Sequence, residues 1–404
     1  MKVLVINAGS SSCKYQLINM DDKTVLCSGL AERIGQENSK ITHKILPDSS
    51  QEKKIMREEY FPTHVEAMEL AISLMIDPEI GVIKDKKEIG GIGHRVLHGG
   101  EEITKPVLVD KHVKDVIKEN FLLGPLHNPA NLMGIEVAEK LFPGTPNVAV
   151  FDTEFGTSLP PAAFMYALPY AMYTDLRVRR YGFHGTSHKY IAKMTSKFVG
   201  KEPHKLRSIT MHLGNGSSMT CVKDGKCFDT SMGLTPLEGL VMGTRCGSID
   251  PAIVPFLQEK KGYTPEEADT LMNKQSGLLG ICGLTDMRDI HAEAEKGNER
   301  CKLAIEMLVR SIRKTLGAYM FLLDGKADAI VFTAGIGEND PVVRSRVCRD
   351  LEIMGIKLDE KENEQRKPGA REISTPDSRV KVLVIPTNEE LEIAEATVEV
   401  LGKK

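Results

Sequence analysis

The sequence has 404 residues, a length that allows two domains with separate hydrophobic cores. Apolar residues make up 41% of it and charged residues 27%, the balance of an ordinary globular protein. Because the formal net charge is −3, no overall basic field favours nucleic acid or an anionic membrane as a partner. An anion site in this protein must therefore be local.

Eight cysteines are scattered along the chain and never form a C-x-x-C pair, which indicates reduced thiols in a cytoplasmic protein. Residues 1–6 form too short an apolar run for a signal peptide. No stretch is long enough to span a bilayer. We therefore expect a cytoplasmic location and no membrane partner.

The N-terminal segment predicts a buried strand, a tight turn and a second strand. Residues 3–6 are uniformly apolar, as in a central strand that is buried on both faces. The turn offers Gly9 and three serines, with Asn7 before it and Lys14 after it. Backbone N–H groups beside a glycine, hydroxyl groups and a cation suit phosphate oxygens.

The same plan recurs at residues 208–222, where a strand, a turn of glycine, asparagine and serine, and a second strand follow one another. Each copy continues into a third strand, expected at residues 24–28 and at 226–230 after a hairpin signal. Either turn alone is explained as well by an ordinary hairpin. Two copies of a three-strand meander favour two related domains that face one nucleotide.

Further elements follow from hydrophobic periodicity and capping signals. A solvent-facing hairpin or insertion is expected at residues 36–59. Further strands are expected at residues 89–96, 147–151, 329–333 and 380–385. Helices are expected at residues 65–76, 109–119, 131–141, after the 181–188 segment to about 198, after 264–267, at 299–323, and from 340–341.

Two of these helices, and the last helix of the chain, carry predicted caps. Thr186 or Ser187 would cap the helix that runs to about residue 198. Residues 264–267 form a capping box with proline at the first helical position. Thr387 and Glu390 form a second capping box that opens the last helix, whereas Glu389 is not explained as a capping residue.

Arg95, Arg245 and Asp152 are the strongest candidates for function. Both arginines lie in glycine-rich loops, where a bulky cation contributes nothing to packing. Surface ion pairing is the usual role of an arginine, but this setting favours anion binding. Asp152 follows a strand directly, where catalytic residues lie in open parallel sheets, although it could merely cap a loop.

Several common sites are excluded or disfavoured. The chain has no P-loop motif and no G-x-S-x-G. The histidine pairs at 94 and 98 and at 184 and 188 have i, i+4 spacing but lack the glutamate of a zinc-protease motif. A strand, a glycine turn at 335–339 and a helix would place a nucleotide at a helix N-terminus, which alone is a weak signal.

With these residues assembled, the sequence resembles the acetate kinase family of carboxylate kinases along its whole length. The segment Gly182-Phe183-His184-Gly185-Thr186-Ser187-His188 is especially specific. The other matching segments are residues 5–14, 93–100, 126–129, 151–153, 212–218, 242–251, 333–339 and 386–390.

The resemblance implies an α/β fold with two ribonuclease-H-like domains of the sugar kinase, heat-shock chaperone and actin superfamily, and an ATP cleft between them. The N-terminal domain would comprise residues 1–151 plus 386–404, and the second domain, with the adenosine site, residues 152–385. The implied reaction is reversible transfer of the ATP γ-phosphoryl group to acetate, giving acetyl phosphate and ADP by direct in-line displacement. A homodimer is also implied.

The resemblance also implies roles for individual residues. Arg95 and Arg245 would bind acetate and the transferring phosphoryl group, His184 would stabilise the transition state, and Asp152 would be the essential carboxylate. Asn7 and Glu389 would hold Mg²⁺, which Mn²⁺ could replace, with Lys14 near the phosphates. The residues lining the phosphates would be His212, Leu213, Gly214, Asn215 and Gly216. Those around the adenosine would be Asp286, Met287, Arg288, Gly335, Ile336, Gly337, Glu338 and Asn339.

A methyl pocket would consist of Leu97, Leu126, Phe183 and Pro236, with leucine at position 97 where relatives often carry valine. Since a carboxylic acid is ionised at neutral pH, the acceptor needs no general base. We therefore expect Asp152 to orient an arginine or the metal. The alternatives are a propionate or butyrate kinase and, from another class, a nucleotide-switched binding module, against which a carboxylate pocket argues.

Overall fold

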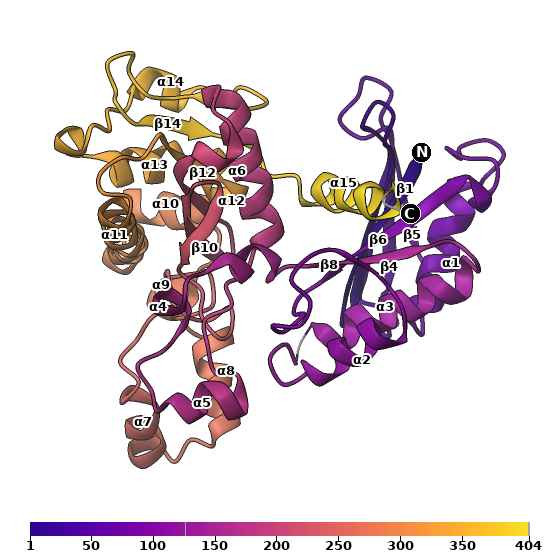
Figure 1. Cartoon of the computed structure of the whole chain (residues 1–404), viewed down its shortest axis with the longest axis horizontal. Helices are drawn as coiled ribbons and strands as arrows, with labels where there is room; N and C mark the ends of the chain where they lie inside the picture. The colour runs from indigo at the N-terminus through magenta and orange to yellow at the C-terminus, as the bar shows by residue number, and fades with distance from the viewer. Residues whose placement is uncertain (126, 403–404) are drawn as a thin grey trace. The chain divides into compact units, whose positions relative to one another are not determined.

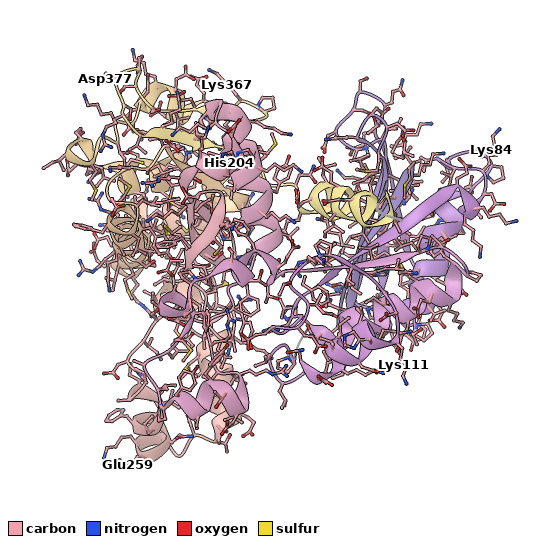
Figure 2. The ribbon with its side chains drawn as sticks, in the orientation of Figure 1. Lys84, Lys111, His204, Glu259, Lys367 and Asp377 are labelled. Atoms are coloured by element: carbon pink, nitrogen blue, oxygen red, sulfur yellow. The ribbon has the colours of Figure 1, made fainter. Side chains whose placement is uncertain are left out.

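The structure, a computed structural model, describes residues 1–125 and 127–402. The chain forms two compact units, each with its own β-sheet (Figure 1). The first unit comprises Met1–Glu154 and the segment that begins at Asn388, and the second comprises Phe155–Thr387. Figure 2 shows exposed side chains of both charges distributed over the surface. No helix among the described residues combines the length and apolarity needed to cross a membrane.

The first sheet has the strand order β5-β4-β3-β2-β1-β6-β8-β7. The first five strands along the chain form an antiparallel meander, so the hairpin expected at residues 36–59 is confirmed. Strands β1, β6 and β8 run parallel to one another. The strand bounds are β1 Lys2–Gly9, β2 Ser12–Asn19, β3 Thr24–Glu32, β4 Lys40–Ile45, β5 Lys53–Glu58, β6 Ile89–Val96, β7 Val107–Leu108 and β8 Asn147–Phe151.

The second sheet has the order β11-β10-β9-β12-β14-β13. Its meander of β9, β10 and β11 confirms the predicted repeat of the N-terminal plan. Strands β9, β12 and β14 then run parallel, as β1, β6 and β8 do in the first sheet. The strand bounds are β9 Arg207–Leu213, β10 Ser217–Lys223, β11 Lys226–Thr230, β12 Ala329–Thr333, β13 Arg371–Glu372 and β14 Lys381–Val384.

Helices cover both faces of the first sheet, because strand β1 is apolar on both sides. Leu4 and Ile6 pack toward α1 (His64–Met75) and α3 (Asn128–Leu141), whereas Val3 and Val5 pack toward α15 (Glu389–Gly402). Helix α2 (Lys111–Glu119) packs beside α3. The carboxyl ends of the parallel strands thus form one edge of a sheet buried on both faces, as expected for the N-terminal strand.

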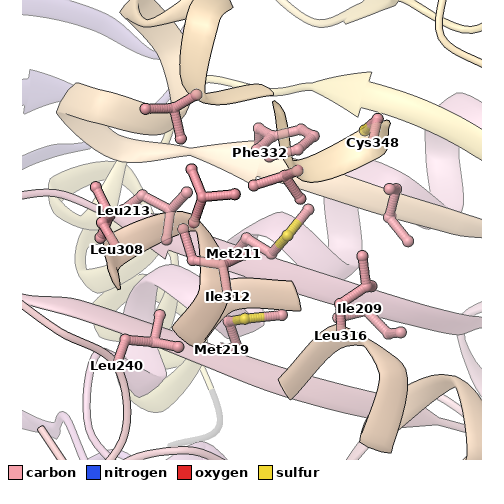
Figure 3. Close-up of a cluster of buried hydrophobic side chains, with 14 of the residues drawn as sticks. Ile209, Met211, Leu213, Met219, Leu240, Leu308, Ile312, Leu316, Phe332 and Cys348 are labelled. Atoms are coloured by element: carbon pink, nitrogen blue, oxygen red, sulfur yellow. The ribbon is translucent and has the colours of Figure 1, made fainter. Parts of the chain in front are cut away.

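The second sheet is covered in the same way. Met211 of β9 and Phe332 of β12 pack with Leu308 and Ile312 of α11 (Glu299–Leu322), as Figure 3 shows. On the other face, α6 (Gly185–Val199) packs Ile191 against strands β12 and β14. The remaining helices of this unit are α4 Pro161–Phe164, α5 Tyr170–Leu176, α7 Ile253–Lys261, α8 Pro265–Lys274, α9 Gly277–Cys282, α10 Met287–Glu295, α12 Ala334–Asn339, α13 Pro341–Cys348 and α14 Glu360–Glu364.

Three local predictions were wrong, whereas the capping box of α8 is confirmed. Helix α6 begins at Gly185, so Thr186 and Ser187 lie inside its first turn and make no N-cap. The cap of α15 is Asn388, whose Oδ1 accepts a hydrogen bond from the Leu391 N–H at 2.9 Å. Residues 335–339 form the short helix α12 instead of a glycine turn.

Candidate active site

Arg95 and Asp152 meet at the carboxyl edge of the first sheet. Arg95 is the penultimate residue of β6, and Asp152 directly follows the neighbouring parallel strand β8. The Arg95 Nη2 donates to Asp152 Oδ2 at 3.1 Å, and the Asp152 side chain is 0% exposed. The Arg95 Nε also lies 3.7 Å from Glu389 Oε2, at the start of α15. The guanidinium is thus held between two carboxylates.

Glu389 lies in a region with an excess of negative charge. Burial, and after it the neighbouring carboxylates Asp152 and Glu390, raise the pKa of Glu389 to about 7, against the opposing effects of Arg95 and Lys14. The Lys14 Nζ forms an ion pair with Glu390 Oε1. Three carboxylates therefore face two cationic side chains, and a further cation would be stabilised beside them.

The residues named for Mg²⁺ supply oxygen donors. Asn7 lies in β1 directly across from Lys14 in β2, and Lys14 in turn contacts the neighbour of Glu389. An amide and carboxylates are the ligands that a hard divalent cation prefers. Across the described ranges, however, no group of three or more His, Cys, Asp or Glu side chains could hold a metal ion. The oxygen donors of Asn7 and Glu389 thus fit Mg²⁺, and the protein would supply only a few of the ligands of this ion.

Two buried asparagines of α3 fix the loop that follows Arg95. Asn131 Oδ1 accepts from the Leu97 N–H at 2.9 Å, and its Nδ2 donates to the Ala8 carbonyl in β1 at 2.8 Å. Asn128 Oδ1 accepts from the His98 N–H at 3.0 Å. Sequence reasoning assigned no role to these amides, although buried asparagines at a helix start are a usable signal. They rigidly connect β1, β6 and α3.

A cluster of histidines occupies the carboxyl edge of the second sheet. His184 precedes α6 in the left-handed region with φ 55°, and His212 is the penultimate residue of β9. Their rings stack with centroids 4.2 Å apart. The His212 Nδ1 lies 2.8 Å from Ser187 Oγ, which is 2.7 Å from Thr387 Oγ1. The specific 182–188 motif is therefore packed onto the end of β9.

Arg245 lies beside His184 over a glycine. A Cβ atom on Gly216 would lie 3.4 Å from His184 Nε2 and 3.5 Å from Arg245 Nη1, so both side chains lie over this residue. The Nη1 donates to the Pro236 carbonyl at 2.9 Å. No carboxylate pairs with Arg245 in the part of the chain that the structure describes, and burial lowers the pKa of this guanidinium. A partly buried cation without a carboxylate partner favours a bound anion.

The residues expected around the phosphates differ in exposure. Gly214, Asn215 and Gly216 form the turn between β9 and β10, and the Gly243 N–H donates to the Asn215 carbonyl at 2.9 Å. Leu213, in contrast, is fully buried in the hydrophobic core. Only the backbone of Leu213 is therefore suited to contact a ligand.

The residues expected around the adenosine belong to two segments. Asp286 caps α10 and accepts from the guanidinium of Arg288, whose side chain is 90% exposed. Met287 packs into the core. In α12, Glu338 Oε1 accepts from the N–H groups of Ala334 and Thr387. Gly335, Ile336, Gly337 and Asn339 lie in the same short helix.

The residues expected for the methyl pocket lie in both units. Leu97, which is 4% exposed, belongs to the first unit. Phe183 and Pro236 belong to the second, where Phe183 is buried. Leu126 lies outside the described residues.

The repeated strand order, with arginine and histidine side chains near the carboxyl edges of the sheets, defines an α/β protein with two ribonuclease-H-like units, the class that contains sugar kinases and actin. The model of the Acetokinase family matches residues 2–395, and the chain belongs to this family. It is 74% identical to an acetate kinase of Desulfovibrio desulfuricans over 403 residues, which covers 100% of both chains.

Solved structures agree with this assignment. The crystal structure of Porphyromonas gingivalis acetate kinase has a TM-score of 0.94 at 43% identity, with 99% of each chain covered. A propionate kinase from Francisella tularensis has a TM-score of 0.91 at 41% identity, also with 99% of each chain covered. The fold expected from the sequence is therefore confirmed.

Proposed function

We propose that this protein is an ATP:acetate phosphotransferase, which transfers the γ-phosphoryl group of ATP to acetate in a reversible, direct in-line displacement. Membership of the acetokinase family supports this reaction. The structural observation that carries it is Arg245, a partly buried cation without a carboxylate partner in the described chain, beside His184 over Gly216. Such a site suits an acceptor or phosphoryl group that arrives as an anion.

The proposed mechanism rests on charge and positioning, as phosphoryl transfer generally does. Acetate, with a pKa of roughly 4, is ionised at neutral pH. Two unit charges repel by about 4 kcal/mol at ~4 Å and an effective dielectric of ~20. Arg95 and Arg245 offset this repulsion, and His184 donates to an equatorial oxygen in the transition state. Asp152 orients Arg95 and removes no proton, since the nucleophile is already charged.

We propose Mg²⁺ as the metal, held by Asn7 and Glu389, with Mn²⁺ able to replace it. When bound, the ion neutralises charge on the nucleotide phosphates. Lys14 would contribute a further positive charge near them. The support for this assignment is the excess of carboxylate over cationic groups around Glu389.

The nucleotide would contact the turn at Gly214, Asn215 and Gly216, with its adenosine near Asp286 and Arg288. The two compact units would correspond to the two domains expected from the sequence. A homodimer in the cytoplasm completes the proposal. Light scattering on the purified protein would measure the oligomeric state.

Propionate is the second candidate acceptor, because the propionate kinase structure resembles the chain nearly as well as the acetate kinase structure does. The decisive assay measures ADP formation with acetate, propionate or butyrate, each with and without a metal chelator. Acetate-dependent ADP formation that Mg²⁺ restores is the expected result. A higher kcat/KM for propionate would overturn the choice of acetate.

A further inference from the structure

A chain of four side chains extends behind His184 into the second unit. His184 Nδ1 lies 2.8 Å from Ser218 Oγ, and the same hydroxyl lies 2.7 Å from His188 Nε2. His188 Nδ1 in turn lies 2.7 Å from Thr210 Oγ1. Ser218, His188 and Thr210 are all buried. They come from β10, α6 and β9, so these hydrogen bonds connect three elements behind the His184 imidazole.

His188 is a neutral link in this chain. Burial, and after it the neighbouring His212, lower the pKa of His188 well below its ordinary value. A neutral imidazole has one N–H and one lone pair, so its two hydroxyl partners must take opposite roles. If Thr210 accepts, Ser218 donates to His188 and accepts from His184 Nδ1. If Thr210 donates, Ser218 accepts from His188 and donates to His184 Nδ1.

Both arrangements engage His184 Nδ1, but they differ at Nε2. When Thr210 donates, a neutral His184 carries its N–H at Nε2, whereas when Thr210 accepts, Nε2 can donate only from the imidazolium. The His184 Nδ1 is engaged by Ser218 in each case, which fixes the rotation of the ring. Its Nε2 lies on the side of Gly216, together with Arg245 Nη1, within about 3.5 Å of the same point. Any proton that His184 shares with a group above Gly216 is therefore carried by Nε2.

We propose that Ser218 and His188, anchored by Thr210, are positioning residues that hold the His184 imidazole with Nε2 toward the transferring phosphoryl group. This inference rests on the proposed function, which places that group above Gly216. Its benefit is realised in the transition state, where charge on the phosphoryl oxygens needs a donor already in place. Loss of these hydrogen bonds behind His184 should thus lower kcat more than it changes the KM for ATP or for acetate.

The first test replaces Ser218→Ala. We expect kcat to fall by about tenfold, since a hydrogen bond of roughly 1.4 kcal/mol corresponds to that factor, while KM for ATP and acetate stays within about twofold. Ser208→Ala is the matched control, because Ser208 is equally buried on β9 and its Oγ has no hydrogen-bond partner in the described chain. This control should leave kcat unchanged. An unchanged kcat in Ser218→Ala would overturn the inference.

A double-mutant cycle separates positioning from general support of the fold. In a His184→Ala background, Ser218→Ala should cause little further loss of kcat, because Ser218 acts on the reaction through His184. An equal loss in both backgrounds would overturn the inference. His188→Gln keeps a polar group near Ser218 and should retain more activity than His188→Ala, whereas equal activities would contradict it. A wild-type protein without acetate-dependent ADP formation would instead refute the proposed function, and the inference with it.

Discussion

The guanidinium of Arg95 donates to the carboxylate of Asp152 at 3.1 Å, from adjacent parallel strands of the first sheet. A second carboxylate, that of Glu389, lies 3.7 Å from Arg95 Nε. Arg245 is the opposite case, a partly buried guanidinium that donates to the Pro236 carbonyl. The two arginines are expected to bind the same anions, but only Arg95 has carboxylate partners in the described residues. Replacing them should therefore change the free energy of unfolding in different ways.

Arg245→Met should abolish most of the activity without destabilising the protein. Removal of a partly buried cation that lacks a carboxylate partner in the described residues relieves its desolvation cost, so the free energy of unfolding should stay equal or rise. Arg95→Met, the matched control, leaves Asp152 and Glu389 without their cation and should cost about 3 kcal/mol. Urea unfolding and ADP formation measure both effects. Full activity of Arg245→Met would remove this arginine from the mechanism, and added guanidinium should partly restore a true loss.

Asp152→Asn should lower kcat by at least about 100-fold while the protein remains folded. The amide keeps the shape of the carboxylate but loses the charge that orients Arg95. Since acetate is already ionised, the wild-type rate should show no solvent isotope effect from proton transfer in the chemical step. Rates in H₂O and D₂O test this directly. A large isotope effect on the chemical step would instead assign Asp152 to general-base catalysis.

Leu97→Ala should broaden the choice of acceptor. One methylene in an apolar pocket is worth about 1–3 kcal/mol, or roughly 10–200-fold in specificity. We expect the wild-type protein to prefer acetate over propionate by that order, and the variant to narrow the gap. Measurements of kcat/KM for both acids provide the test. Leu74→Ala, a buried leucine of α1, is the control for lost packing alone, and an unchanged ratio in Leu97→Ala would refute the pocket assignment.

Acid should destabilise the protein through buried His43, whose Nδ1 lies 2.8 Å from the Tyr15 hydroxyl. Burial lowers the pKa of His43 to about 4. Between about pH 6.5 and 4 the unfolded chain binds a proton that the folded one does not. The stability is therefore fully present above about pH 6.5 and is lost as pH falls, by at most about 1.4 kcal/mol per pH unit.

Unfolding free energies at about pH 7 and about pH 5 measure this dependence. His43→Gln should reduce the difference between the two values. His204→Gln, at an exposed position of the second unit, should leave it unchanged. A difference that is the same in His43→Gln as in the wild-type protein would show that other groups cause the acid sensitivity.

The sequence alone predicted the two meanders, the parallel strands and the position of Asp152 after β8. These features follow from local signals, since apolar runs, turn residues and strand ends are written within a few consecutive residues. The position of Arg95 at the end of β6 follows in the same way. The acetokinase resemblance was readable for the same reason, because its motifs are short and contiguous.

Only the tertiary structure decided which side chains meet. Ser218 and Thr210 join His188 because the register of β9 and β10 brings them together, and no periodicity of the sequence encodes that register. The start of α6 and the cap of α15 were predicted wrongly, because Ser187 and Thr387 bond to each other instead of to their own helix termini. A hydroxyl can satisfy either partner, and the choice depends on distant segments that fold against it.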